Sequence, residues 1–304
     1  MTTQARQSLR SVQGSSRRAA SGIRTAVFLL GGRGIRMWPL TLAVPKGLLP
    51  VGSRSLLHFA MAEAGACGIK KFVLVVDSAA TASALKRANL LSATYQSRGH
   101  KEANRTVREW LWLVDRIVAI VWPDPRLPSG LAAGLLTVER IVKDDWFTVL
   151  SVDDLVLDAA QGLPREMAIW KTNRHWVIGL TRLKREQFAE FGVAKAKRRL
   201  DGCYDVINAQ EKPGWHLGYR GFGIVGRYIV DQSIFQRIRE CRADTLAERS
   251  QARFHITRCL DHEALRGNLL GAMVSNSYFH TGTMKGYLAA WRHYLRACAE
   301  DAPS

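Results

Sequence analysis

The feature that constrains this chain most is the stretch 26–50, A-V-F-L-L-G-G-R-G-I-R-M-W-P-L-T-L-A-V-P-K-G-L-L-P. It opens with an apolar run typical of a buried strand. Three glycines end that run: Gly31, Gly32 and Gly34. Glycines leave no Cβ in the path of a ligand, and successive backbone N–H groups in such a turn can face an anion. Arg36 and Lys46 follow, and two prolines stiffen the loop between them. The stretch predicts a strand and a phosphate-binding loop, with an ordinary glycine turn as the alternative.

Beyond this loop, apolar segments alternate with helical patterns. We expect strands at 72–76, 116–122, 146–152, 176–180, 193–196, 204–209 and 269–274, and a glycine-spaced apolar segment at 221–229. We expect helices at 55–66, 80–113, 131–142, 231–240 and 284–299. All-apolar strands separated by helices indicate a parallel sheet that is covered on both faces. The predicted fold is α/β, with a Rossmann-like, doubly wound, mostly parallel mixed sheet.

Composition and charge narrow the class of protein. A hydrophobic content of 47% supports a well-buried core, and no apolar run reaches the ~18 residues of a membrane span. The five cysteines are scattered without a C-x-x-C pair, which argues against a disulfide framework or zinc site and favours a reducing, cytoplasmic location.

The net charge of +18 fits the steering of phosphorylated substrates, attraction to anionic membranes, nucleic-acid binding, or simply an arginine-rich proteome. The arginines are spread along the chain rather than clustered, so the last explanation is favoured. Nucleic-acid binding is kept as a weaker alternative.

Residues 1–24 differ from the rest of the chain. They contain five arginines and no acidic residue, and they lack the apolar region of a secretory signal. This composition fits an organellar transit peptide or a disordered basic tail. We favour the tail, and predict a disordered basic extension at 1–24 followed by one folded domain at 25–304.

The residues G-G-R-G-I-R-M-W-P-L-T-L-A-V-P-K resemble the G-x-G-T-R-x-x-P-x-T-x-x-x-P-K signature of sugar-1-phosphate nucleotidyltransferases, above all that of the bacterial UTP–glucose-1-phosphate uridylyltransferases. Two positions depart, because Ile35 replaces the usual threonine and Gly47 replaces an acidic or amide residue. The resemblance implies a nucleotidyltransferase domain that transfers a nucleotidyl group, expected to be uridylyl from UTP, to a sugar-1-phosphate, expected to be glucose-1-phosphate. It also implies a dimer or tetramer.

By this resemblance Arg36 would hold the leaving β- and γ-phosphates, and Lys46 would neutralise charge at the α-phosphate. The attacking phosphate is already anionic, so catalysis is largely positioning and charge neutralisation. Asp153 and Asp154 lie in L-S-V-D-D-L, which resembles the family's L-x-x-D-D motif. Its first aspartate binds the metal, so Asp153 is expected to bind Mg²⁺. The alternative, a turn or N-cap aspartate, fits Asp154 better.

The sugar and base sites are likewise assigned by resemblance. Glu211 and Lys212 match an E-K-P motif in which the glutamate bonds sugar hydroxyls and the lysine binds the sugar phosphate. Gly192 would face the sugar, and Gly130 the base, through their backbones. The glutamine expected before Gly130 is absent, and Pro125 occupies its place, so selectivity for uracil is an open question.

Further departures lie near the sugar and the metal. The segment R-F-H-I-T-R, with Arg253, His255 and Arg258, aligns only loosely with the family, and Gly221 replaces an asparagine. His280 stands where a second metal-binding aspartate belongs. Imidazole suits Mn²⁺ or another softer divalent metal better than Mg²⁺. Two alternatives therefore stay open: the same chemistry with a different base or sugar, or a catalytically impaired relative that binds a nucleotide or a partner protein.

Overall fold

The computed structural model describes residues 22–32, 34–94, 101–123, 130–158, 161–213, 221–247, 255–274 and 277–300. Nearly all of the expected basic extension, together with Pro125 and Arg253, lies outside these ranges. The strands are β1 (Thr25–Leu29), β2 (Pro50–Val51), β3 (Arg54–Ser55), β4 (Lys71–Val75), β5 (Ile117–Val121), β6 (Trp146–Ser151), β7 (Asp154–Val156), β8 (Trp176–Arg182), β9 (Gly192–Arg198), β10 (Tyr204–Glu211), β11 (Phe222–Asp231), β12 (Leu269–Met273) and β13 (Tyr278–His280).

The helices follow the predicted positions in part. They are α2 (Leu40–Ala43), α3 (Leu56–Ala66), α4 (Ala79–Thr94), α5 (Lys101–Val114), α6 (Leu131–Leu136), α7 (Leu163–Asn173), α8 (Ser233–Ala247), α9 (Thr257–Leu265) and α10 (Met284–Glu300), with short 3₁₀ turns η1 (Ile35–Met37), η2 (Lys46–Leu48) and η4 (Arg185–Gln187). The helix expected at 131–142 ends early, where the Thr137 hydroxyl donates to the Gly134 carbonyl at 2.6 Å and competes with the helical ladder. Helices α7 and α9 were not predicted.

In the described residues, the main sheet has nine strands in the order β5-β4-β1-β6-β11-β8-β12-β10-β9. Strands β5, β4, β1 and β6 are parallel, as predicted. Beyond β6 the expectation of a mostly parallel sheet is wrong, because β8–β12 is the one parallel pair there among the described strands. A second pairing of β11 with β9 closes β11, β8, β12, β10 and β9 into a ring. Strands β9 and β10 are joined by residues 199–203, too few for the crossover that a parallel pair needs.

The sheet separates two apolar cores, and β1 contributes to both. Ala26 and Phe28 face the core built with α3, α5 and α10, whereas Val27 and Leu29 face the core built with α6, α8 and α9. A strand buried on both faces reads as a continuous apolar run, which is why its position could be predicted.

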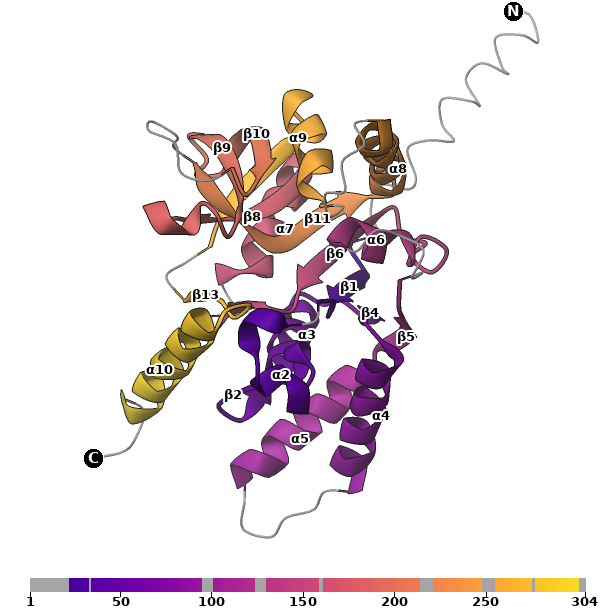
Figure 1. Ribbon diagram of the computed structural model, residues 1–304, viewed down its shortest axis with the longest axis vertical. Helices are drawn as coiled ribbons and strands as arrows, with labels where there is room; N and C mark the ends of the chain where they lie inside the picture. Colours follow the sequence, from indigo (N-terminus) through magenta and orange to yellow (C-terminus); the bar gives the residue numbers. More distant parts are fainter. Residues whose placement is uncertain are drawn as a thin grey trace, which may run out of the picture.

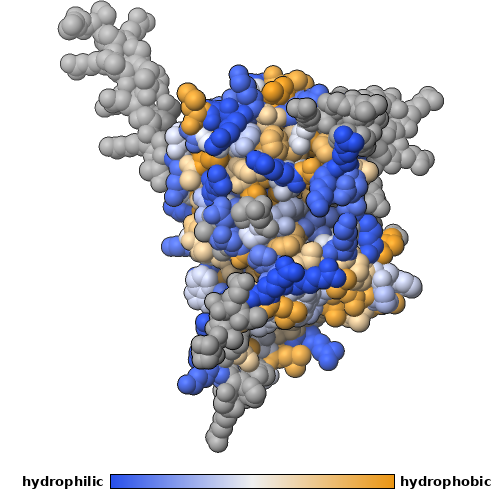
Figure 2. Space-filling model, turned by 90° about the vertical axis from the view of Figure 1, so that its left-hand side faces the viewer, coloured by the Kyte–Doolittle hydropathy of each residue, from blue (hydrophilic) through white to orange (hydrophobic). Residues whose placement is uncertain are grey.

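Figure 1 shows how the helices surround the sheet. Helices α4 and α5 form a hairpin beside the β4–β5 edge, and α10 lies against β2. Helices α8 and α9 lie at the other end, near β10 and β11. On the face shown in Figure 2, hydrophilic side chains are interspersed with apolar ones. Among the described residues, none of the helices combines the length and apolar character needed to traverse a bilayer.

Candidate functional site

The glycine loop begins where β1 ends. Gly31 and Gly32 are exposed, and a Cβ at either position would find no heavy atom within 4 Å. Gly32 has a φ of 110° and Gly34 a φ of 61°, values that side chains disfavour. Thr41 Oγ1 donates to the Gly34 carbonyl at 3.0 Å, and a Cβ at Gly34 would lie 2.6 Å from Thr41 Cγ2. The loop is therefore fixed at its end and open at its start.

An ion pair joins the loop to the end of β6. Lys46, in η2, contacts Asp153 Oδ2, and the two side chains are 12% and 24% exposed. Burial would raise the pKa of the Asp153 carboxyl, but the Lys46 ammonium and, less strongly, His280 lower it to about 2. Thr281 donates through both its N–H and its hydroxyl to the Asp153 carbonyl, each at 2.8 Å. The backbone of Asp153 is thus held while its carboxylate faces the loop.

Asp154 is enclosed by hydrogen bonds. Its Oδ2 accepts the Gly226 N–H at 2.9 Å, and its Oδ1 accepts the Tyr278 hydroxyl at 2.6 Å. His280 lies opposite it in the β13–β7 pair, with Nδ1 3.2 Å from Oδ1. Neighbouring aspartates therefore occupy different environments, since Asp154 anchors the structure and Asp153 faces the loop.

His280 lies between the two aspartates and the cations of the loop. Its Nε2 is 3.5 Å from a guanidinium nitrogen of Arg36. A Cβ at Gly282 would lie 2.9 Å from both Asp153 Oδ2 and His280 Nε2, so only glycine leaves room between them. Burial opposes protonation of His280, but Asp154 and then Asp153 raise its pKa overall.

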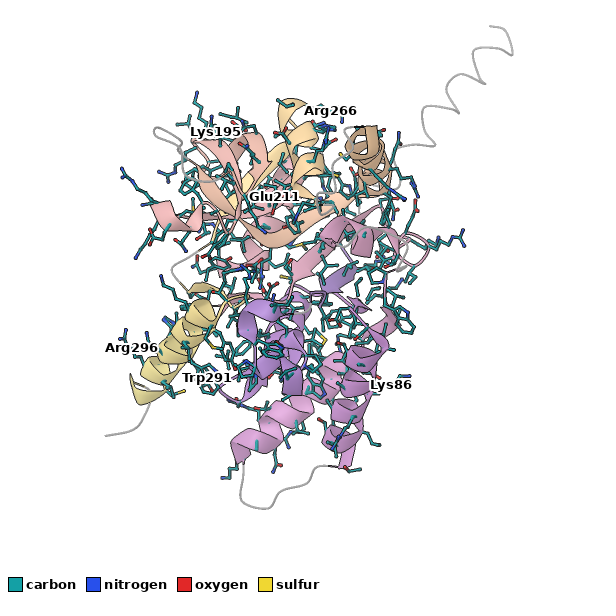
Figure 3. The ribbon with its side chains drawn as sticks, in the orientation of Figure 1. Lys86, Lys195, Glu211, Arg266, Trp291 and Arg296 are labelled. Atoms are coloured by element: carbon teal, nitrogen blue, oxygen red, sulfur yellow. The ribbon has the colours of Figure 1, made fainter. Side chains whose placement is uncertain are left out.

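A second group of polar residues surrounds Glu211. Gly192 is its partner in the β9–β10 pair. Thr257 Oγ1 donates to Glu211 Oε2 at 2.6 Å, and His255 Nδ1 lies 3.3 Å from Oε1. Lys212 Nζ is 3.7 Å from Oε1, on a backbone whose φ of 42° is unusual for a residue other than glycine. Figure 3 shows Glu211 in the middle of the upper half of the molecule. Gly192, Glu211 and Lys212, which the resemblance assigns to one sugar site, are thus close together.

Phe191 connects the two groups. Its carbonyl accepts the Lys212 N–H at 3.1 Å, and its ring centroid lies 5.0 Å from that of His280. Gly130 stands at the N-terminus of α6 with a φ of 154°. That helix packs on the last residues of β1 and β4, since a Cβ at Gly134 would lie 3.2 Å from Val75. Gly130 is therefore beside the edge of the sheet from which the glycine loop leaves.

The side chains around Asp153 supply one suitable ligand for Mg²⁺ rather than two. Within the described ranges, no three Cys, His, Asp or Glu side chains are grouped so as to hold a metal ion. Mg²⁺ is commonly bound by one or two carboxylates together with substrate phosphates, a pattern that Asp153 fits. His280 does not fit it, because imidazole is a poor magnesium ligand and its nitrogens face Asp154 and Arg36.

Three polar residues of these groups were not predicted as site residues: Thr257, Tyr278 and Thr281. Each lies within three residues of a histidine noted in the sequence. Their partners are distant in the chain, and Thr257 and Glu211 are separated by 46 positions. A local pattern gives no sign of such contacts.

The model of the nucleotidyl transferase family matches residues 25–297. The UTP–glucose-1-phosphate uridylyltransferase of Pseudomonas aeruginosa is 24% identical over 275 residues, covering 88% of this chain and 94% of that protein. The enzyme of the same name from Bacillus subtilis is 25% identical over 220 residues, covering 72% of this chain and 74% of that protein.

Solved structures share the fold. A UDP-glucose pyrophosphorylase complexed with UDP-glucose aligns with a TM-score of 0.75 at 21% identity, covering 90% of this chain and 99% of that one. The apo form of a UDP-glucose pyrophosphorylase also has a TM-score of 0.75, at 20% identity, covering 91% and 99%. The architecture is therefore the α/β nucleotidyltransferase fold.

Proposed function

We propose that this chain, which belongs to the nucleotidyl transferase family, transfers a uridylyl group from UTP to glucose-1-phosphate and releases pyrophosphate. One observation carries the proposal: Arg36 and Lys46 converge on Asp153 and His280 at the glycine loop. The names of the curated relatives support the choice of substrates.

The proposed reaction needs charge neutralisation more than proton transfer. A phosphate oxygen of the sugar-1-phosphate attacks the α-phosphorus in line, and the bond to the oxygen that bridges the α- and β-phosphates breaks. Arg36 binds the departing β- and γ-phosphates, and Lys46 neutralises the charge that accumulates around the α-phosphorus. The open N–H groups of Gly31 and Gly32 line the triphosphate, and Lys212 holds the sugar phosphate.

Mg²⁺, held by Asp153 and the triphosphate, would supply further charge neutralisation. Because His280 supplies no carboxylate, this site would be weaker than one with a pair of aspartates, and an imidazole there would suit Mn²⁺ or another softer metal better than Mg²⁺.

His280→Asp is expected to lower the Mg²⁺ concentration for half-maximal turnover by roughly tenfold, because it adds an oxygen ligand and a negative charge. The measurement is turnover against Mg²⁺ and Mn²⁺ concentration for the parent and the variant. His280→Asn is the matched control, since it removes the imidazole without adding charge. Equal metal dependence in His280→Asp and the parent would contradict a metal role for this position.

Lys212→Ala is expected to weaken sugar-1-phosphate binding by roughly ten- to a hundredfold, because a charge-assisted hydrogen bond of about 1.5–3 kcal/mol is lost. UTP binding should change little. Lys197→Ala, at an exposed position of β9, is the control. Isothermal titration with each ligand measures both affinities, and equal weakening of the two would contradict the assignment.

The substrate pair itself is tested by measuring pyrophosphate release across nucleoside triphosphates and sugar-1-phosphates. The greatest turnover is expected with UTP and glucose-1-phosphate. The second candidate is the same chemistry on another sugar, and the position of His255 beside Glu211 favours it. No pyrophosphate release with any pair would favour a binding protein instead.

Several broader features belong to the same proposal. The parallel strands β5, β4, β1 and β6 would form a Rossmann-like nucleotide-binding layer, since ligands bind outside the carboxyl ends of such strands. Residues 25–304 would form the catalytic domain and 1–24 an appendage. A dimer or tetramer in the cytoplasm is the expected form. The five cysteines are all free of disulfides, which is compatible with a reducing location such as the cytoplasm.

A further inference from the structure

A bulge in β11 lies next to the candidate site. The pairing of β11 with β8 shifts register between Val225 and Tyr228, so Gly226 and Arg227 have no pairing position on β8. Bulges of this kind redirect side chains and are frequent beside active sites. Arg227 is turned into the core, where it is 1% exposed.

Both residues of the bulge bind the turn that carries Asp153. The Arg227 guanidinium donates to the Ser151 carbonyl at 3.4 Å and also to the Asp154 carbonyl. The Gly226 N–H donates to Asp154 Oδ2 at 2.9 Å. These contacts hold the turn on both sides of Asp153.

Glu63 of α3 fixes the guanidinium. Arg227 donates from Nη2 to Glu63 Oε2 at 2.8 Å and from Nε to Oε1 at 3.4 Å. The Leu163 N–H also donates to Glu63 Oε1, at 2.6 Å. Both charged side chains are 2% exposed. Burying such a pair carries a large desolvation cost, and apolar residues of similar volume often stabilise a fold as well or better. Its presence therefore points to a requirement for geometry rather than stability.

We propose that Arg227, held by Glu63, is a positioning residue that fixes the turn 151–154 and thereby holds Asp153 opposite Lys46. Thr281 holds the same turn from the other side, through the Asp153 carbonyl. In an in-line transfer a displacement of about 1 Å can cost roughly 100-fold in rate. The expected effect on turnover rests on the proposed function. The expected loss of rigidity in the turn 151–154 does not.

The double variant Glu63→Leu/Arg227→Met tests this, because it removes the carbonyl contacts without leaving one member of the ion pair buried alone. It also removes the acceptor of the Leu163 N–H at the start of α7, which is why folding is measured as well. It is expected to stay folded and to lose roughly 100-fold in kcat. The KM values for UTP and glucose-1-phosphate should stay within about threefold of the parent, since no substrate-binding group is removed.

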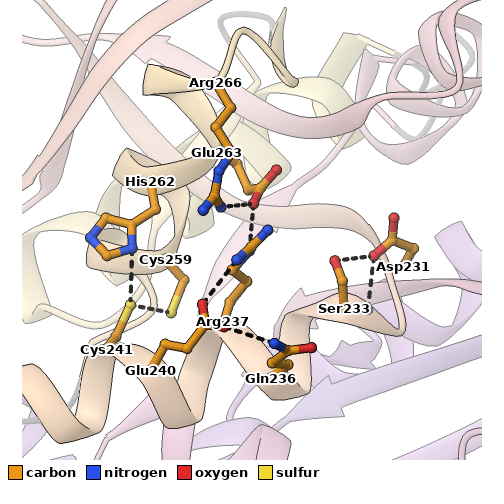
Figure 4. Close-up of polar contacts among 10 residues, drawn as sticks. All are labelled: Asp231, Ser233, Gln236, Arg237, Glu240, Cys241, Cys259, His262, Glu263 and Arg266. Carbon is orange, nitrogen blue, oxygen red and sulfur yellow. Dashed lines mark hydrogen bonds and ion pairs between the residues drawn. The ribbon is translucent and has the colours of Figure 1, made fainter.

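A matched control comes from a second arginine–glutamate pair, away from the site. Arg237 of α8 donates to Glu263 of α9 at 2.7 Å, as Figure 4 shows. Glu263→Leu/Arg237→Met removes the same pair of residue types from a more exposed position, where the side chains are 6% and 22% exposed, and its kcat should stay within about twofold of the parent.

Amide hydrogen exchange gives a readout that needs no substrate. Exchange at Gly226 and Thr281, whose N–H groups bind Asp154 and Asp153, should be at least about tenfold faster in Glu63→Leu/Arg227→Met at similar thermal stability. If the parent itself transfers no nucleotide, the proposed function fails and exchange alone still tests the positioning role.

Arg227→Lys provides a second test should the double variant not fold. It keeps the charge beside Glu63, but one ammonium cannot reproduce the guanidinium's contacts with both carbonyls and the carboxylate. It should show the same loss of kcat and the same faster exchange. If the parent is active, a folded variant of either kind that keeps the turnover of the parent would overturn the positioning role. So would a folded variant whose amide exchange at Gly226 and Thr281 equals that of the parent.

Discussion

Lys46→Ala is expected to lower kcat by roughly 100- to 1,000-fold while the protein stays folded. Lys46 is the cation that contacts Asp153, and it is the first residue of the η2 turn, directly after Pro45. Charge on the oxygens around the reacting phosphorus increases in the transition state, so a cation preorganised there acts most strongly on kcat. The fold should tolerate the change, because Asp153 is 24% exposed and water can solvate its carboxylate.

Steady-state kinetics and a thermal unfolding curve measure the two expectations. Lys46→Arg keeps the charge in a bulkier group and should recover part of the rate. Lys86→Ala is the matched control, because Lys86 is an exposed residue of α4, at the lower right of the molecule in Figure 3. Near-parent turnover in Lys46→Ala would contradict the phosphate-binding assignment of the whole loop.

The free energy of unfolding is expected to fall by on the order of 5 kcal/mol as pH rises from about 4.5 to 8, through Glu166. Glu166 is completely buried on α7, and among the described residues neither carboxylate oxygen has a hydrogen-bond partner. Burial, and then the negative charge of Glu63, raise its pKa to about 8, against the opposing effects of Arg227 and Arg165. The native protein therefore holds this carboxyl as the neutral acid at pH 7.

The direction follows from proton uptake. In the unfolded chain this glutamate has its ordinary pKa of 4.5. Between that value and about 8 the folded protein binds a proton that the unfolded chain has released, so stability falls as pH rises. The contribution is complete below pH 4.5 and is lost progressively up to the pKa of the folded state.

Glu166→Gln should remove this slope, because glutamine is a neutral group of the same shape. Chemical denaturation of parent and variant across the pH range measures it. Glu186→Gln, at an exposed position of η4, is the control and should leave the slope unchanged. An identical pH dependence in the parent and in Glu166→Gln would assign the slope to other groups.

Local patterns in the sequence predicted the parallel half of the sheet and the glycine loop that follows β1. The apolar run of β1 could be read directly because both faces of that strand are buried. Gly32 and Gly34 could be read because their positive φ values exclude most other residues. Both features belong to residues that are contiguous in the chain, so the amino-acid sequence alone is enough to predict them.

The tertiary structure alone decided how the second half of the sheet is arranged. Apolar segments at 176–180 and 269–274 fit a parallel or an antiparallel strand equally well. The direction of each neighbour follows from loop lengths and from the second pairing of β11 with β9. These are long-range pairings, for which a single segment carries no signal.

The same division applies within the site. Sequence patterns placed Asp153 and Asp154 at the end of a strand, and the family resemblance singled out Asp153 as the site residue. Only the structure shows their partners, Lys46 for Asp153 and both Gly226 and Tyr278 for Asp154. Arg227 lies in the apolar segment 221–229 that was expected from the sequence. Its guanidinium contacts the Asp154 carbonyl because the bulge in β11 turns the side chain toward it. Side-chain direction depends on register across the sheet, and register is a property of two strands rather than of one.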